Sequence, residues 1–179
     1  MLIQSQKLTI RYFEFEDLER FSQYRALPEI SEFQSWEHYT FDDAKDLFKR
    51  MDYRQFGVID SWWQLAIVKR FNNCLLGDLA VHFIDAEQVE LGFTIAPPYQ
   101  GQGIAYEAVN LLLDFLFNSL EKHRVVAITD TRNHKSVALL QRLGFRCEAH
   151  FKKNIFFKGE WGDEFLYAKL KSEHQASVS

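Results

Sequence analysis

The most constraining feature of this chain is a strand, a glycine-containing loop and a buried helix that follow one another near its middle. In Val89–Ile95 every odd position is apolar. The even positions are Glu90, Gly92 and Thr94, so one strand face belongs to a core and the other is free. After the loop, Ile104–Leu120 contains helix formers with apolar side chains all round, which predicts a largely buried helix. A strand connected to a buried helix in this way predicts an α/β domain.

The same patterns assign the rest of the chain. They predict strands at Leu8–Phe13, Trp62–Val68, Leu75–Ile84, Val125–Thr129, Phe145–Phe157 and Phe165–Leu170, and helices at Phe15–Arg25, Thr40–Met51 and Ser136–Arg142. Pro28 is expected to end the first helix. The order β-α-α-β-β-β-α-β-α-β-β predicts a single α/β domain over residues 1–171 with a mixed sheet. We expect residues 172–179 to form a disordered tail.

Composition excludes several function classes. The chain has 179 residues, of which 47% are hydrophobic, so it can bury a core. With 21 Lys and Arg against 25 Asp and Glu the net charge is −4, which argues against a nucleic-acid partner. No apolar run approaches the ~20 residues that span a bilayer, and the first residues lack a secretion signal. Cys74 and Cys147 stand alone, without metal-ligand spacing. We expect a cytoplasmic protein with free thiols, no membrane partner and no metal.

The loop Gln100–Ala105 has the composition of an anion-binding loop. It leads into the predicted buried helix, where consecutive backbone N–H groups and the helix dipole can hold a diphosphate. It is not a dinucleotide fingerprint, because Tyr106 stands where GxGxxG needs glycine, and no Gly-Lys-Ser/Thr of a P-loop follows. A plain strand-to-helix turn remains an equal alternative on these residues alone.

Longer motifs around this loop point to a family. Gln100-x-x-Gly103-x-Ala105 resembles the acetyl-coenzyme A signature of the GNAT acetyltransferase superfamily. The stretches Glu90–Pro97 and Gly101–Ala108 resemble the branch of ribosomal-protein N-terminal acetyltransferases RimJ and RimL. Further similarities to that branch are Asn133-x-x-Ser136, Leu139–Phe145, Gly159-x-Trp161-x-Asp163 and Tyr167. The resemblance covers nearly the whole chain and is strongest from Glu90 to Phe145.

The resemblance implies a fold and a co-substrate. The fold would be a mixed, mostly antiparallel sheet flanked by helices, with a V-shaped split between its two central strands. Acetyl-CoA would lie in the split, its pantetheine arm pairing with the backbone of Phe93, Thr94 and Ile95. Its pyrophosphate would lie in the loop formed by Gln100, Gly101, Gln102, Gly103, Ile104 and Ala105, whose N–H groups from Gln102 onward face it. Asn133 would hydrogen-bond the pantetheine amide or fix its own loop. Homodimers are common among similar proteins.

Acetylation of an amine needs a base for the nitrogen and a proton donor for the departing thiolate. Glu90, on the polar strand face, is the candidate base, and a solvated carboxylate is the alternative. Many GNAT enzymes carry a tyrosine acid seven residues after the position of Asn133, but this chain has Leu140 there. Ser136 is the replacement that the resemblance implies, by a hydrogen bond to the sulfur. The alternative for Ser136 is a helix cap.

Other candidates are weaker on sequence grounds. His82 and His134 are further candidates for proton transfer, although most lone histidines are structural. Trp36, Trp62 and Trp63 could line an acceptor pocket, but aromatic residues at these spacings more often belong to the core. We expect Glu107 to hold the helix start and to play no catalytic part.

The sequence therefore predicts an acetyl-CoA-dependent N-acetyltransferase that works by direct attack in a ternary complex. The acceptor is a protein N-terminus or a small-molecule amine, and a polyamine or an aminoglycoside remains an alternative within the same fold. A net charge of −4 leans slightly toward a cationic acceptor. The competing class is a coenzyme A-binding sensor that does not catalyse transfer, since the usual tyrosine is absent.

Overall fold

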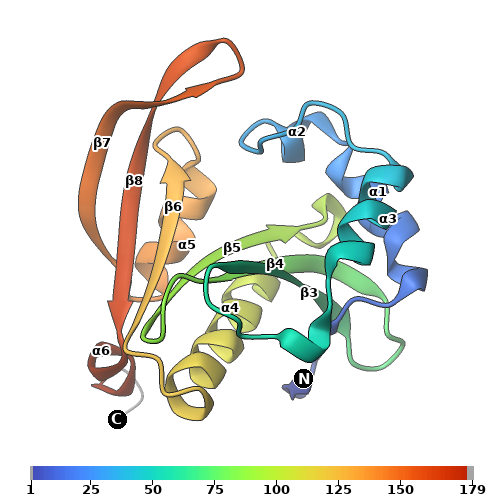
Figure 1. Ribbon diagram of the computed structural model, residues 1–179, viewed down its shortest axis with the longest axis horizontal. Helices are drawn as coiled ribbons and strands as arrows, with labels where there is room; N and C mark the ends of the chain where they lie inside the picture. The colour runs from blue at the N-terminus through green and yellow to red at the C-terminus, as the bar shows by residue number, and fades with distance from the viewer. Residues whose placement is uncertain (1, 177–179) are drawn as a thin grey trace.

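The computed structural model describes residues 2–176, which form an eight-stranded sheet in the order β1-β2-β3-β4-β5-β6-β8-β7 (Figure 1). The strands are β1 Leu2–Gln4, β2 Leu8–Tyr12, β3 Ser61–Lys69, β4 Leu75–Phe83, β5 Gln88–Ile95, β6 Arg124–Asp130, β7 Arg146–Phe157 and β8 Glu160–Leu170. The helices are α1 Leu18–Arg25, α2 Pro28–Ser31, α3 Phe41–Arg50, α4 Ile104–Asp114, α5 His134–Arg142 and α6 Lys171–Ala176. Short 3₁₀ turns are η1 Phe15–Asp17, η2 Tyr53–Gln55 and η3 Pro97–Tyr99, and η4 Phe115–Ser119 is a π-helical turn.

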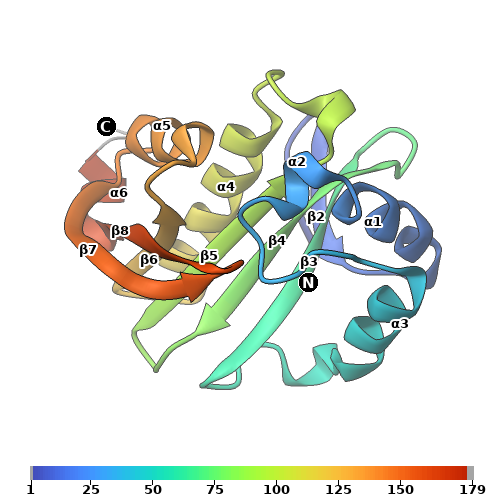
Figure 2. The ribbon, with the colours of Figure 1, turned by 90° about the horizontal axis from the view of Figure 1, so that it is seen from above.

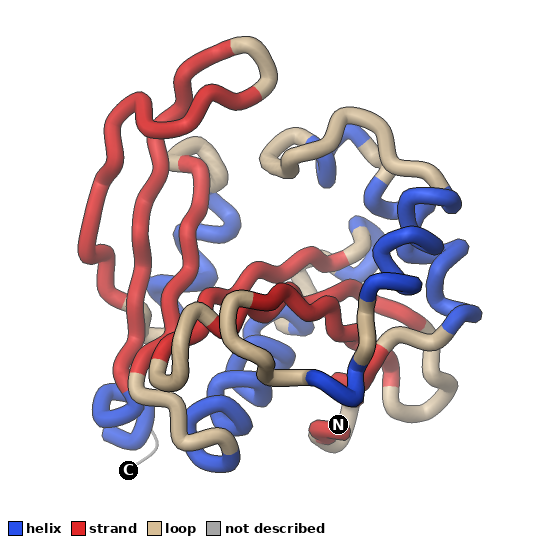
Figure 3. Tube along the Cα trace, in the orientation of Figure 1, coloured by secondary structure: helices blue, strands red, loops and turns tan. Residues whose placement is uncertain are grey.

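The sheet is divided between β5 and β6. All other neighbouring strands are antiparallel, whereas β5 and β6 are parallel and pair only at Gln88↔Arg124, Val89↔Val125 and Glu90↔Val126. Beyond Glu90 the two strands diverge (Figure 3). Viewed from above, β3, β4 and β5 lie side by side with α4 along them, while β6, β7 and β8 form a separate group with α5 and α6 (Figure 2). The predicted mixed, mostly antiparallel sheet with a central split is confirmed.

Two apolar clusters hold the helices against the sheet. On one face the odd-numbered residues of β5, such as Val89 and Leu91, belong to the same buried cluster as Val109, Leu112 and Leu113 of α4. Each fully buried aliphatic side chain contributes about 1.5–3 kcal/mol to stability. The other cluster joins α1 and α3 to the sheet and contains Phe13, Phe21, Tyr24, Ala44, Ala66 and Val68. The buried residues of α4 begin at Ala108, so the packed part of the helix anchors a half-buried first turn that follows the end of β5.

Three sequence-based assignments need correction. Strand β1 was not predicted, since three residues are too short for an alternation pattern. Pro28 begins α2 instead of simply ending a helix, because proline suits the first helical position. The tail expected to be disordered from Ser172 forms α6 as far as Ala176. It docks because His174 is buried, with Nε2 2.6 Å from Asp114 Oδ1 and its ring against Phe117; residues 177–179 lie outside the described part.

No helix within residues 2–176 is long and apolar enough to cross a bilayer. Cys74 and Cys147 are both free thiols, as expected.

Candidate active site

The loop before α4 has a backbone that glycine makes possible. Gly101 and Gly103 have φ values of 72° and 79°, in the left-handed region that other residues enter only with strain. Gly103 is the N-cap of α4, and a Cβ built on it would meet no atom within 4 Å. The space beside this helix N-terminus is therefore open. In the free protein, the backbone conformation and not a steric clash is what favours glycine at position 103.

Glutamine side chains fix the ends of the loop. Gln100 donates from Nε2 to the carbonyl of Ile95 at 3.0 Å and accepts from Lys135 at 3.2 Å. Gln102 donates to the carbonyl of Pro98 at 2.9 Å. These amides connect the loop to the end of β5 and to α5. Because both side chains are engaged in this way, the backbone N–H groups of the loop are the donors left to bind an anion. Glu107 accepts from Ser5 Oγ at 2.5 Å, which agrees with its expected role at the helix start.

A cavity of about 980 Å³ opens beside this loop. Its walls are the N-terminal ends of α4 and α5, the last residues of β5 and the segment from Glu29 to Gln34. Three basic side chains, Arg132, Lys135 and Arg142, line its α5 side. Two carboxylates, Glu29 and Glu32, line another part of the cavity, so the positive charge is confined to the α5 side. That side, together with the open helix N-terminus, suits a phosphorylated molecule. His134 also lines this cavity.

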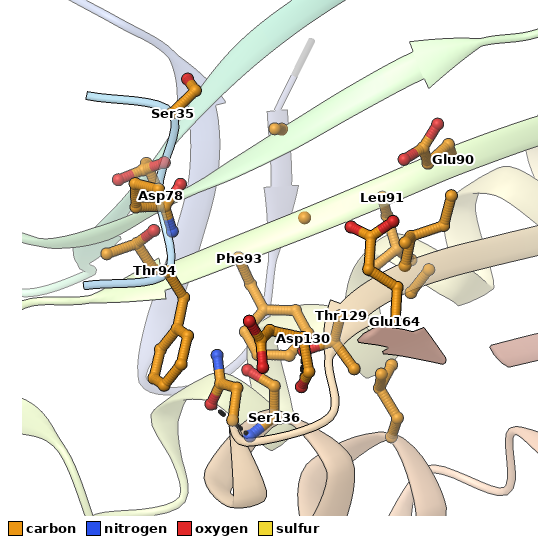
Figure 4. Close-up of a pocket in the computed structure, with 18 of the residues that line it drawn as sticks. Ser35, Asp78, Glu90, Leu91, Phe93, Thr94, Thr129, Asp130, Ser136 and Glu164 are labelled. Atoms are coloured by element: carbon orange, nitrogen blue, oxygen red, sulfur yellow. Dashed lines mark hydrogen bonds between the residues drawn. The ribbon is translucent and has the colours of Figure 1, made fainter. Parts of the chain in front are cut away.

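A second cavity of about 330 Å³ lies in the split itself. Cross-strand neighbours Ala80 and Gly92 line it, and a methyl group beside a residue without a side chain leaves room there. The two cavities share lining residues and so form one cleft; these are Phe33, Gln34, Phe93, Thr94, Asn133 and Ser136. Figure 4 shows Glu90 and Glu164 at one end of the smaller cavity, Asp78 and Thr94 at the other, and Ser136 below them.

The smaller cavity is acidic. It is lined by one arginine, Arg25, and four carboxylates, Asp78, Glu90, Asp130 and Glu164. Asp78 is almost fully buried and pairs with Arg25 at 3.2 Å, and Asp130 pairs with Arg132 at 2.8 Å. Arg132 holds the pKa of Asp130 below its usual range. Within residues 2–176, no lysine or arginine forms an ion pair with Glu90 or Glu164, so these two leave excess negative charge in the cavity.

Glu90 has the environment of a tuned base. It lies opposite His82 in the β4–β5 register, and its Oε2 is 3.6 Å from His82 Nδ1. Burial raises the pKa of Glu90, the neighbouring His82 opposes that shift, and the negative charge of Glu164 adds to it. A carboxylate with a raised pKa holds a proton more strongly near neutral pH, which is the property a general base needs.

Ser136 and Asn133 are brought together at the start of α5. Asn133 is the N-cap of this helix, its Oδ1 accepting from the Ser136 N–H at 3.2 Å. The alternative that Ser136 is the cap is therefore wrong. Its side chain instead lines both cavities at the place where they meet. Leu140 is buried and provides only apolar surface at the position of the usual tyrosine.

Sequence reasoning missed Asp78, Asp130, Glu164 and Arg25. Asp78 had a usable signal, since it interrupts the apolar run Leu75–Val81 of a predicted strand. Its carboxylate also accepts hydrogen bonds from Tyr24 and Gln64. Glu164 had no local signal, because only the pairing of β6 with β8 places it opposite Asp130.

Comparison with known proteins assigns the family. The family described as acetyltransferase (GNAT) domain matches residues 7–146. The chain belongs to the GNAT acetyltransferase family. A curated relative, the uncharacterized N-acetyltransferase YnaD of Bacillus subtilis, is 29% identical over 174 residues, covering 97% of this chain and 99% of the relative. A solved GNAT acetyltransferase from Bacillus anthracis has a TM-score of 0.87 at 27% identity, covering 97% and 100% of the two chains.

Two other proteins similar to this chain have named acceptors. The ribosomal protein uS5-alanine N-acetyltransferase of Escherichia coli is 33% identical over 114 residues, 63% of this chain and 55% of that protein. Spermidine N-acetyltransferase of Vibrio cholerae, solved with CoA and spermine, has the same fold, with a TM-score of 0.82 at 23% identity and coverage of 96% and 99%. This GNAT chain is accordingly an acetyl-CoA-dependent N-acetyltransferase of amines.

Proposed function

We propose that this GNAT protein acetylates the primary amine of a cationic acceptor, by direct attack on acetyl-CoA bound in the same cleft. The observation that carries this proposal is the continuity of the two cavities, one with an open helix N-terminus and basic side chains, the other with two carboxylates, Glu90 and Glu164, that no lysine or arginine of residues 2–176 pairs with. A thioester and an amine entering from the two ends meet at Ser136. The sensor alternative gives no reason for the acidic cavity.

The donor end of the cleft has suitable groups for coenzyme A. The β6-facing edge of β5 lacks a strand partner beyond Glu90, so the backbone from Phe93 to Ile95 can pair with pantetheine amides, although the Ile95 carbonyl already accepts one hydrogen bond from Gln100. The N–H groups from Gln102 to Ala105 can hold the pyrophosphate beside Gly101 and Gly103. Gln100 supports this loop through its bond to Ile95, and Asn133 keeps the start of α5 in place.

The proposed chemistry uses Glu90, at one end of the smaller cavity, and Ser136, where the two cavities meet. Glu90 takes a proton from the acceptor ammonium, and the neutral nitrogen attacks the thioester carbonyl carbon. The tetrahedral intermediate collapses with cleavage of the carbon–sulfur bond. Ser136 donates a hydrogen bond to the developing thiolate, so its contribution is made in the transition state. No covalent enzyme intermediate is involved, and this chemistry requires no metal.

Two acceptor classes are in view. The resemblance to the ribosomal-protein N-terminal acetyltransferase branch, supported by similarity to the uS5-alanine enzyme, favours a protein N-terminus. The excess negative charge at Glu90 and Glu164 favours an acceptor with a second positive charge, as in a polyamine or an aminoglycoside. A basic N-terminal peptide satisfies both observations, and we propose it as the first acceptor to try.

The test is release of free thiol from acetyl-CoA with an amine panel, with products identified by mass. The panel contains an alanyl peptide amide with lysine at the third position, the same peptide with glutamine there, spermidine and kanamycin. We expect acetylation at the α-amine, faster with the lysine peptide. CoA binding without thiol release for any amine would support the sensor instead.

The proposal includes a setting and partners. We propose a cytoplasmic protein, since a reducing compartment suits two free cysteines, without nucleic-acid or membrane partners. A homodimer is also proposed, supported by the exposed apolar side chains of Phe156 and Trp161 on the β7–β8 hairpin. The molecular mass in solution tests it.

A further inference from the structure

His82 lies between a carboxylate in the cleft and a carboxylate at the surface. Its Nδ1 is 3.6 Å from Glu90 Oε2, and its Nε2 is 3.4 Å from Asp60 Oδ1. Nδ1 is fully buried and has no hydrogen-bond partner within the described chain. The Asp60 side chain is 91% exposed, whereas that of Glu90 is 23% exposed. The imidazole therefore connects the cleft base to a solvated carboxylate.

The strands hold this imidazole in one orientation. Trp62 lies opposite His82 in the β3–β4 register, and its ring is stacked on the imidazole at 4.7 Å and 12°. Asp60 is fixed just before β3 by a bond from its N–H to the Phe83 carbonyl at 2.6 Å. If the Nε2 proton is donated to Asp60, neutral His82 presents the Nδ1 lone pair to Glu90.

The number of protons that leave the acceptor nitrogen indicates a role for His82. An acceptor that arrives as an ammonium loses two protons at nitrogen during acetylation, one before attack and one from the tetrahedral intermediate. A single carboxylate can hold only one of them. We propose that His82 takes the first proton from Glu90, so that Glu90 is again a carboxylate when the second proton must leave. This inference rests on the proposed function and assigns His82 as a positioning residue for the cleft base.

The steps balance as follows. The first proton passes from the ammonium to Glu90 and on to His82 Nδ1, giving an imidazolium flanked by two carboxylates. The second passes from the intermediate to Glu90. When the products leave, both protons return through Glu90 to water in the cleft, while the thiolate takes one proton from water. The net change is one proton released for each amide and free thiol formed.

The charged neighbours favour this role. Asp60 and Glu90 face His82 from the segment before β3 and from β5, each with a carboxylate oxygen within 4 Å of an imidazole nitrogen. The negative charge of Glu164 of β8 raises the pKa of Glu90, which disfavours the ionised form of Glu90. Trp62, the nearest β3 side chain, carries no charge. A proton on His82 therefore reduces the repulsion between two acidic side chains.

The first experiment compares kcat/KM of wild type and His82→Gln over pH 6.5–9.5, with the lysine-containing alanyl peptide amide as acceptor. An α-amine has a pKa of about 7.7–8.0, so this acceptor changes from ammonium to neutral amine within the range. We expect His82→Gln to lose about tenfold below that pKa, less than the ~10²-fold or more of a general base because Glu90 is retained, and much less above it. Asp60→Asn should show a smaller loss with the same trend.

The control is His123→Gln, which removes an exposed imidazole outside both cavities. A loss in His82→Gln that is constant with pH, or no loss, overturns the inference while leaving the proposed function intact. If wild type acetylates no amine of the panel, the proposed function fails first.

A second measurement does not depend on turnover. Nitrogen NMR of the neutral imidazole should find the Nε2–H tautomer of His82 in wild type, and Asp60→Asn should reduce that preference. A neutral His82 with its proton on Nδ1 overturns the inference, because that nitrogen could not accept from Glu90. Thermal unfolding of each variant checks that the fold is retained.

Discussion

A Gly103→Ala variant separates two possible reasons for a glycine at the start of α4: the left-handed backbone conformation and the space proposed for the pyrophosphate. The φ of 79° places an alanine there in the left-handed region, at a cost of about 1–2 kcal/mol. No atom lies within 4 Å of the added Cβ, so a steric clash adds nothing to this cost in the free protein. A cost of this size is a fraction of the ~5–15 kcal/mol that stabilises a domain, so the variant folds. The expected fall in melting temperature is ~2–8 °C.

Gly159, in the turn between β7 and β8, is the matched control. Its φ is 86°, and a Cβ there would also meet no atom within 4 Å. Gly159→Ala should therefore lose about the same stability as Gly103→Ala. Only the Gly103 variant adds a methyl group to the larger cavity, in the space proposed for the pyrophosphate. Its affinity for CoA should fall at least tenfold, or ~1.4 kcal/mol, while that of Gly159→Ala stays unchanged.

Calorimetric titration with CoA, together with thermal unfolding of all three proteins, makes the comparison. If Gly103→Ala is folded and binds CoA as wild type does, the phosphate does not approach this residue and the loop assignment is wrong. If both variants lose CoA affinity equally, the effect comes from general destabilisation.

Three other changes test the cleft. Glu90→Gln should lower turnover by ~10²-fold or more and abolish the acidic limb of the pH–rate profile. Because burial raises the pKa of Glu90, the acidic limb of wild type should lie at a higher pH than that expected for a free glutamate. Ser136→Ala should lower kcat and leave acetyl-CoA affinity nearly unchanged, and equal turnover would contradict its role. Asp78→Asn leaves the buried Arg25 without its ion-pair partner and should reduce the free energy of unfolding by about 3–5 kcal/mol in urea titrations.

What the sequence predicted correctly depends on local patterns. The strand Val89–Ile95, with one apolar face, follows from apolar residues at a spacing of two, and the buried helix after it from apolar residues at a spacing of three to four. The glycine loop is specified by neighbouring residues. Glu90 could be selected because strand alternation alone places it on the polar face. These features needed no knowledge of which strands pair.

What the sequence did not predict depends on distant contacts. Glu164 reaches the cavity only because β8 pairs with β6, and its residue type carries no information about that pairing. Helix α6 is too short to be stable alone, and it forms because His174 is buried between Asp114 and Phe117, some sixty residues earlier. The assignment of Asn133 as the α5 cap in place of Ser136 required the observed hydrogen bond.

The short pairing of β5 with β6 leaves an unpaired strand edge in the interior of the sheet. Exposed edges recruit other chains and lead to aggregation, so proteins shield them. Here Phe33 and Gln34 border the edge from one side and Asn133 from the other, while Lys158 at the hairpin tip donates a hydrogen bond to the Ser31 carbonyl across the top of the cleft. A polypeptide strand that paired with this edge would bring a side chain at every residue into the cleft, whereas a chain of amides and methylene groups can make the same backbone hydrogen bonds with none. The unpaired edge therefore favours a slender occupant over another strand.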